Sequence, residues 1–143
     1  MGLVVVLAWA GGCAAGLSEP KNVALGESFT LEVGEAAQIE AEALQIGFEN
    51  VPTDSRCPTD VQCIWEGDAT VRVWVQKAPR TRERLALHTS AREPRSATYQ
   101  GYGIELLRLA PLPVSGRTIE QEDYEATLEV TRGSTRSSDS LSR

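Results

Sequence analysis

The sequence predicts an all-β fold, an antiparallel β-sandwich of about seven strands with an immunoglobulin-like arrangement, and an open β-barrel is the alternative. Three observations favour this class. Several short segments alternate apolar and polar residues, turn-forming residues separate them, and no stretch carries a convincing helical period. With 143 residues, 41% of them hydrophobic and 24% charged, the chain has room for one domain with a single core.

The N-terminal segment has the character of an export signal. Leu3–Ala10 is apolar but too short to cross a bilayer, whereas its length fits the hydrophobic region of a signal peptide. Ala10-Gly11-Gly12-Cys13 resembles the box in which a bacterial lipoprotein cysteine becomes acylated. Signal cleavage after Ala8-Trp9-Ala10, which would release a soluble protein, is the alternative.

Cysteine usage favours the lipid anchor. Three cysteines leave one unpaired in an oxidising compartment, and acylation of Cys13 removes the odd one. We therefore expect an export signal over residues 1–13 and a polar tether over 14–26. The expected location is the cell envelope, with the protein held on the outer membrane or cell surface through Cys13. A soluble periplasmic or secreted protein is the alternative.

The first half of the predicted domain, which spans residues 27–132, contains two strand signals. Ser28–Val33 alternates, with Phe29, Leu31 and Val33 on one face. A second alternating set over 37–43 slips by one residue after Ala43, and a β-bulge in a single bent strand would produce that slip. A helix over 35–45 is the alternative, because this stretch is rich in Ala, Glu and Gln.

The second half contains the strongest strand signal, Asp68–Lys77, which places Ala69, Val71, Val73 and Val75 on one face and larger residues, including Arg72 and Trp74, on the other. Further strands are expected over Arg84–His88, Tyr99–Leu109 and Tyr124–Val130. In Tyr99–Leu109 the alternation of apolar and polar residues also shifts by one residue, at Leu106 and Leu107. Thr89–Ala97 is expected to be a loop, and the Ser- and Arg-rich residues 133–143 are expected to be disordered.

A long connection over residues 51–67 carries most of the residues that could act chemically. Cys57 and Cys63 are six positions apart, which is neither the C-x-x-C spacing of thiol oxidoreductases nor half of a zinc site with a second ligand pair. In an exported protein this spacing predicts a structural disulfide. Trp65 is expected to pack on the disulfide as a lid over the core, and a ligand-stacking platform is the alternative.

Four carboxylates crowd the same connection: Asp54, Asp60, Glu66 and Asp68. Hard oxygen ligands of this kind suit calcium, so they are weak candidates for a metal site. The alternative is structural, with Asp54 capping the turn and pairing with Arg56. Tyr124 resembles the tyrosine corner of β-sandwiches, whose hydroxyl bonds to nearby backbone.

Catalysis is not predicted. The single histidine, His88, has no partner motif, and the sequence lacks a nucleophile elbow, a phosphate-binding glycine loop and an H-E-x-x-H motif. We therefore expect no enzyme activity and no cofactor. A net charge of −6 argues against nucleic acid as a partner. The chain is expected to be a monomer.

The run Asp54-Ser-Arg-Cys-Pro-Thr-Asp-Val-Gln-Cys-Ile-Trp-Glu-Gly67 resembles the signature of a family of small bacterial secreted proteins and lipoproteins. The resemblance extends more loosely from Phe29 to Val130, and Glu66 stands where that pattern commonly has Ala. The resemblance implies an exported location and a β fold, and the family has no assigned activity.

Three hypotheses for function follow. The first is a non-catalytic binding or structural module, anchored in the envelope, that presents residues 51–67 to an envelope protein or a glycan, with Trp65, Arg56 and Asp54 as candidate binding residues. The second is a β-sandwich protease inhibitor that uses Pro52–Val61 or Ser90–Thr98 as a wedge. The third is a calcium-binding protein, or a metal-dependent or redox enzyme, that uses the acidic residues between 54 and 68.

Overall fold

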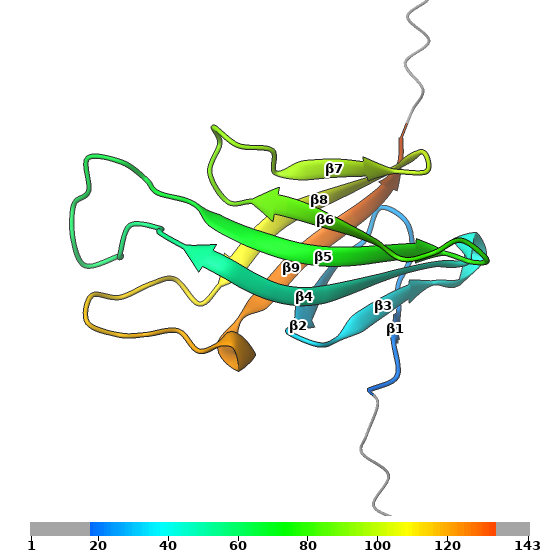
Figure 1. The fold of residues 1–143 in the computed structure, drawn as a ribbon, viewed down its shortest axis with the longest axis horizontal. Helices are drawn as coiled ribbons and strands as arrows, with labels where there is room; N and C mark the ends of the chain where they lie inside the picture. Colours follow the sequence, from blue (N-terminus) through cyan, green and yellow to red (C-terminus); the bar gives the residue numbers. More distant parts are fainter. Residues whose placement is uncertain (1–17, 134–143) are drawn as a thin grey trace, which may run out of the picture.

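A computed structural model describes residues 18–133 and shows two β-sheets packed face to face (Figure 1). The first sheet has the order β1-β3-β4-β5-β6 and the second has the order β2-β9-β8-β7. The strands are β1 (Lys21–Asn22), β2 (Ser28–Glu32), β3 (Ala36–Ile39), β4 (Leu44–Asp54), β5 (Ala69–Lys77), β6 (Glu83–His88), β7 (Ser96–Tyr99), β8 (Tyr102–Ala110) and β9 (Glu125–Arg132). Two short 3-10 helices, η1 (Glu40–Glu42) and η2 (Gln121–Asp123), are the only helices in this part of the chain.

The two sheets share one core, which the alternating strands supply from both sides. Leu31, Ile46, Val73, Leu106 and Leu128 come from different strands and are fully buried. Side chains one residue away in each strand point to solvent, because successive residues of a strand face opposite sides of the sheet. The predicted inward set of β5 is confirmed, since Ala69, Val71, Val73 and Val75 are all 0% exposed.

The all-β class and the face-to-face sheets agree with the prediction, but the details differ. The structure has nine strands, and all neighbouring pairs are antiparallel except β1 and β3. Neither sheet closes into a barrel, so the open-barrel alternative is not observed. The strand order differs from the immunoglobulin order, in which neighbours within a sheet are often non-consecutive in sequence; apart from β1 beside β3, β2 beside β9 is the one such antiparallel pair in the described part of the chain. Instead β3 to β6 are consecutive neighbours, and so are β7 to β9.

Two hairpins correct the sequence analysis. The phase slip after Ala43 is a chain reversal and not a bulge in one bent strand: β3 and β4 pair antiparallel around η1, with Ile39 opposite Leu44. Ala43 has φ +50, the left-handed conformation that ends the turn. The predicted strand 99–109 corresponds to β8, which begins at Tyr102, and the end of the predicted loop 89–97 belongs to β7; β7 and β8 form the second hairpin across Gln100 and Gly101. The later slip in β8 is confirmed as a bulge between Leu106 and Arg108.

Smaller corrections concern the ends of the chain. The predicted tether includes β1, which pairs parallel with β3, and Val23 and Leu25 pack against the core. The predicted export signal with Cys13, residues 14–17 of the tether and nearly all of the predicted tail lie outside the described residues. No helix among residues 18–133 has the length and apolar character needed to span a membrane.

Candidate functional site

Three loops gather at one end of the sandwich (Figure 1). They are the disulfide loop (residues 55–68, between β4 and β5), the β6–β7 loop (89–95) and the β8–β9 loop (111–124, including η2). We call this the loop end. The opposite end, the turn end, carries the short connections 40–43, 78–82 and 100–101. Consecutive antiparallel strands put alternate connections at opposite ends, so three long loops that are far apart in sequence become neighbours.

The base of the disulfide loop extends the β4–β5 hairpin. The Ser55 amide donates to the Asp68 carbonyl at 2.7 Å, and the Cys57 amide donates to the Glu66 carbonyl at 2.9 Å. Gly67 fits this narrow base for two reasons. It has φ +69, and a Cβ atom there would lie 1.9 Å from the Ser55 carbonyl oxygen. The loop therefore leaves the sheet in a defined direction.

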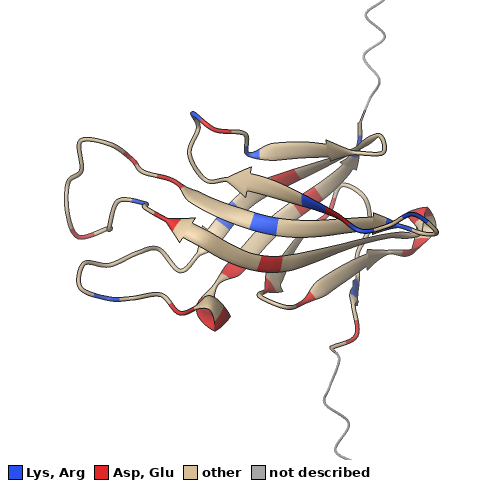
Figure 2. Ribbon diagram, viewed as in Figure 1, with Lys and Arg blue, Asp and Glu red and all other residues tan. Residues whose placement is uncertain are grey.

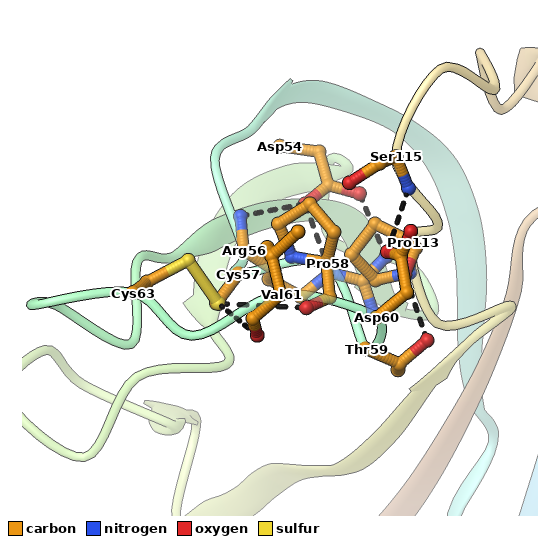
Figure 3. The surroundings of a disulfide bond; sticks show 10 residues. All are labelled: Asp54, Arg56, Cys57, Pro58, Thr59, Asp60, Val61, Cys63, Pro113 and Ser115. Carbon is orange, nitrogen blue, oxygen red and sulfur yellow. Dashed lines mark hydrogen bonds and ion pairs between the residues drawn. A yellow bond between two sulfur atoms is a disulfide. The ribbon is translucent and has the colours of Figure 1, made fainter.

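The middle of the loop is fixed by a disulfide and by contacts with the β8–β9 loop (Figure 3). Cys57 and Cys63 are bonded, with their Cα atoms 5.9 Å apart, which confirms the predicted pairing. The Thr59 amide donates to the Pro113 carbonyl at 2.9 Å. The Ser115 amide donates to Asp60 Oδ1 at 2.9 Å and lowers the pKa of that carboxyl group. The two loops thus form one surface.

A nearly buried ion pair anchors this surface from below. Arg56 Nη2 lies 2.7 Å from Asp54 Oδ2, Arg56 Nε donates to Asp54 Oδ1 at 2.9 Å, and the Arg56 and Asp54 side chains are 9% and 12% exposed. The guanidinium also donates to the carbonyls of Leu109 and Pro111 at 2.9 and 3.0 Å, which ties β4 to the opposite sheet. The predicted Asp54–Arg56 pair is confirmed, and it leaves neither side chain free for a ligand.

Tyr124 completes the anchor. Its hydroxyl donates to Asp54 Oδ2 at 3.0 Å, so it bonds a carboxylate far away in sequence and not nearby backbone, unlike a tyrosine corner. Burial and the neighbouring Asp54 carboxylate raise the pKa of Tyr124 to about 12. Burial by itself would raise the pKa of Asp54, but the hydrogen bonds from Arg56 outweigh it, and the net pKa lies below its usual value.

Above the anchor, the loops expose apolar side chains. The exposed fraction is 92% for Ile64 and 67% for Trp65, so the expectation that Trp65 is a lid over the core is wrong. The large hydrophobic side chains exposed on the two joined loops, which we call the apolar patch, are Val61, Ile64, Trp65, Leu112 and Val114. Elsewhere among residues 18–133, Leu107 is the only large hydrophobic side chain with comparable exposure.

Beside Trp65, an open groove separates the disulfide loop from the β6–β7 loop. The Arg92 guanidinium lies 5.3 Å from the centre of the Trp65 ring, within the range of a cation–π contact. The buried Ser90 hydroxyl donates to Glu66 Oε1 at 2.6 Å, and Asp68 Oδ1 accepts from the Thr89 and Ser90 amides at 3.0 and 2.9 Å. These bonds hold the β6–β7 loop against the base of the disulfide loop.

The single histidine belongs to this base. His88 Nδ1 lies 2.6 Å from Asp68 Oδ2. Burial would raise the pKa of Asp68, but the Ser90 amide and His88 hydrogen bonds outweigh it and the net pKa is lowered. The contacts of His88 and Asp68 therefore hold the start of the β6–β7 loop in place.

The four carboxylates proposed as weak metal ligands are not brought together. Asp54 bonds Arg56 and Tyr124, and Asp60 bonds the Ser115 amide. Glu66 bonds Ser90, while Asp68 faces His88. Within residues 18–133, no group of three or more His, Cys, Asp or Glu side chains is arranged to hold a metal ion.

The wedge segments suggested for a protease inhibitor are only partly loops. Pro52 to Asp54 lie in β4 and Ser96 to Thr98 lie in β7. The segment that protrudes is centred on Ile64 and Trp65 instead. Sequence reasoning did not single out Ile64, Leu112 or Val114. Their signal was available, because large apolar residues in proline- and polar-rich connections cannot belong to an alternating strand face.

Comparison of the chain with known proteins finds no matching family model, no matching curated protein and no matching solved structure. Function is therefore inferred from the geometry of the chain itself.

Proposed function

We propose that the protein is a non-catalytic binding module of the cell envelope that presents its loop end to a partner. One observation carries this proposal: the exposed large hydrophobic side chains concentrate in the apolar patch, on loops that are held in place. Large apolar side chains that are exposed together at one end of a domain are typical of an interaction site. Five of the six exposed large hydrophobic side chains among residues 18–133 lie at this one end, which makes a general packing defect a poor explanation.

The rigidity of these loops supports binding. A partner that must first order flexible loops loses affinity to the entropy of ordering, whereas a fixed surface avoids that loss. Here the disulfide, the Thr59–Pro113 and Asp60–Ser115 bonds and the Arg56 anchor already hold the loops. The polar groups beneath the patch are occupied by these structural bonds, which favours a binding role over a catalytic one.

Export and anchoring through Cys13 complete the proposal. The disulfide between Cys57 and Cys63 supports an oxidising compartment. The Cys13→Ser variant should move from the membrane fraction to the soluble fraction. A mature N-terminus that begins before residue 13, or unchanged fractionation of the variant, would count against a lipid anchor on Cys13.

Site-specific photo-crosslinking in intact cells tests the binding role. The photoreactive residue p-benzoylphenylalanine replaces Ile64 in the full chain, and it replaces Thr81, an exposed residue of the turn end, in a matched control. We expect a discrete adduct from position 64 and none from position 81. Equal labelling from both positions, or no adduct from either, would reject the loop end as a binding surface.

A further inference from the structure

We infer that the partner of the loop end is a polypeptide with an apolar protrusion flanked by lysine or arginine side chains, and that it is not a glycan. This inference rests on the proposed function and identifies the class of ligand. Two observations carry it: the side-chain types in the apolar patch, and the charges on the loops of the loop end.

The chemistry of the patch favours a polypeptide. Sugars are recognised by stacking on aromatic rings combined with hydrogen bonds, whereas branched aliphatic side chains offer neither. Only one of the patch residues, Trp65, is aromatic, and Arg92 lies over its ring. Ile64, the most exposed member, and Val61, Leu112 and Val114 are aliphatic. Such a surface gains free energy by excluding water against another apolar side chain.

The shape of the surface agrees with this partner. The open groove beside Trp65 is bounded by Ile64 on the disulfide loop and by Ala91 and Glu93 on the β6–β7 loop. A groove next to projecting aliphatic groups can receive one side chain of a partner, while Ile64 contacts the partner residues on either side of that side chain. Anchors seated in pockets at the centre of an interface dominate the binding energy of protein complexes.

Charge complementarity decides the second part of the inference. The three loops that form the loop end also carry exposed acidic side chains: Asp60, Glu66, Glu93, Glu120, Glu122 and Asp123. The exposed basic residues on the same loops are Arg92, Arg95 and Arg117. None of the six acids forms an ion pair with another described residue. Figure 2 shows the acidic η2 and the acidic tip of the disulfide loop at this end.

An apolar centre with an acidic rim is complementary to an apolar protrusion with a basic rim. Rim charges act mainly through the rate of association, and salt screens their effect. The acids at the start of η2 and within it are the clearest part of the rim, because Glu120, Glu122 and Asp123 are exposed and their carboxylates accept no hydrogen bond from another side chain among residues 18–133.

The test extends the crosslinking experiment with the full chain carrying p-benzoylphenylalanine at position 64. One variant adds Glu120→Lys, Glu122→Lys and Asp123→Lys. Its matched control adds Glu19→Lys, Glu40→Lys and Glu83→Lys, which change the net charge equally at exposed positions outside the loop end. Thermal unfolding of both variants verifies that they fold, and crosslinking is repeated in isolated envelopes at low and high salt.

We expect an adduct that a protease degrades, with the crosslinked peptide rich in lysine or arginine around an apolar residue. The η2 variant should lower the adduct yield about tenfold, as should a rise from about 0.05 to about 0.5 M salt, while the control variant should keep the yield. An adduct that glycan-cleaving enzymes release, or a protein adduct that neither charge reversal nor salt affects, would overturn the inference and leave the proposed function standing. If the protein that carries only the photoreactive residue at position 64 gave no adduct beyond that seen from position 81, the proposed function itself would be overturned.

Discussion

The two ends of the sandwich are both held by charged side chains, but among residues 18–133 only the loop end exposes large hydrophobic side chains. At the turn end, the Glu42 carboxylate accepts from the Tyr102 hydroxyl and pairs with Arg132, and Lys77 Nζ lies 2.8 Å from the Tyr102 oxygen. These contacts join β5 and η1 of one sheet to β8 and β9 of the other. At the loop end, Arg56 joins the sheets in a similar way from beneath the loops.

The two ends differ in the connections that cover these contacts and in the side chains that those connections expose. The turn end has short connections and no exposed large hydrophobic side chain in the described part of the chain, whereas the loop end carries the apolar patch. Both ends are therefore well fixed, and exposure at one of them is not a consequence of loose structure. The comparison predicts that substitutions in the two anchors reduce stability, while substitutions in the patch do not.

The largest expected effect is at the loop-end anchor. The Arg56→Ala variant leaves Asp54 charged, nearly buried and without its partner, and it removes the donors to two carbonyls. Removing one member of a buried pair costs about 3–5 kcal/mol in free energy of unfolding. Urea unfolding of the variant and the wild type measures this loss in free energy of unfolding.

The exposed pair Arg84–Glu49 provides the control. Its arginine side chain is 72% exposed, and Arg84→Ala should cost no more than about 1 kcal/mol. If both variants lost the same free energy, Arg56 would be an ordinary surface residue and not an anchor.

The turn-end anchor should be the weaker of the two. Tyr102→Phe keeps the buried ring and removes the hydroxyl that contacts Glu42 and Lys77, so we expect a loss of about 1–3 kcal/mol. Tyr99→Phe is the matched control, because its hydroxyl accepts one hydrogen bond, from the Lys77 amide at 3.1 Å. A loss at position 102 no larger than the loss at position 99 would argue that the charged contacts of the turn end add little.

The pH dependence of stability at alkaline pH should report on the loop-end anchor through Tyr124, whose pKa is raised in the folded protein. The pKa of Tyr124 rises from 10.0 to about 12 on folding. Between these values the unfolded chain loses the hydroxyl proton while the folded protein keeps it, so stability falls as pH rises through that window. The slope of unfolding free energy against pH between 10 and 12 should be shallower in Tyr124→Phe. Equal slopes would mean that neither burial nor the Asp54 carboxylate raises the pKa of Tyr124 in the folded protein.

The sequence predicted those parts of the fold where a single face is buried over many residues. β5 is the clearest case, because its register is determined by the alternation of buried valines with larger, partly exposed residues. The two hairpins were missed for a physical reason. A one-residue slip in alternation results from a bulge or from a complete reversal, and period alone does not distinguish them. β7, with the sequence Ser-Ala-Thr-Tyr, buries too little apolar surface to be recognised.

The candidate site was predicted in its covalent and ionic parts only. The Cys57–Cys63 disulfide and the Asp54–Arg56 pair involve residues close in sequence, so spacing and charge were sufficient. The contacts between loops were not predictable, because the Thr59–Pro113 and Glu66–Ser90 bonds depend on which loops the strand order brings together. Trp65 was misassigned because a tryptophan beside a disulfide in a small domain is commonly buried, and burial cannot be read from one residue type.

The smallest expected effect on stability is the most informative about function. Trp65 is 67% exposed, so Trp65→Ala should change the free energy of unfolding by no more than about 0.5 kcal/mol. Phe48→Ala is the control for a buried aromatic residue; Phe48 is 0% exposed, and its loss should cost about 3–5 kcal/mol. Thermal unfolding compares the two variants, and the crosslink from position 64 gives the second readout. A variant that melts like the wild type but gives less adduct separates binding from folding at the loop end. A large loss of stability in Trp65→Ala would instead mean that this side chain packs against the domain, and the apolar patch would then be part of the core that the loops cover.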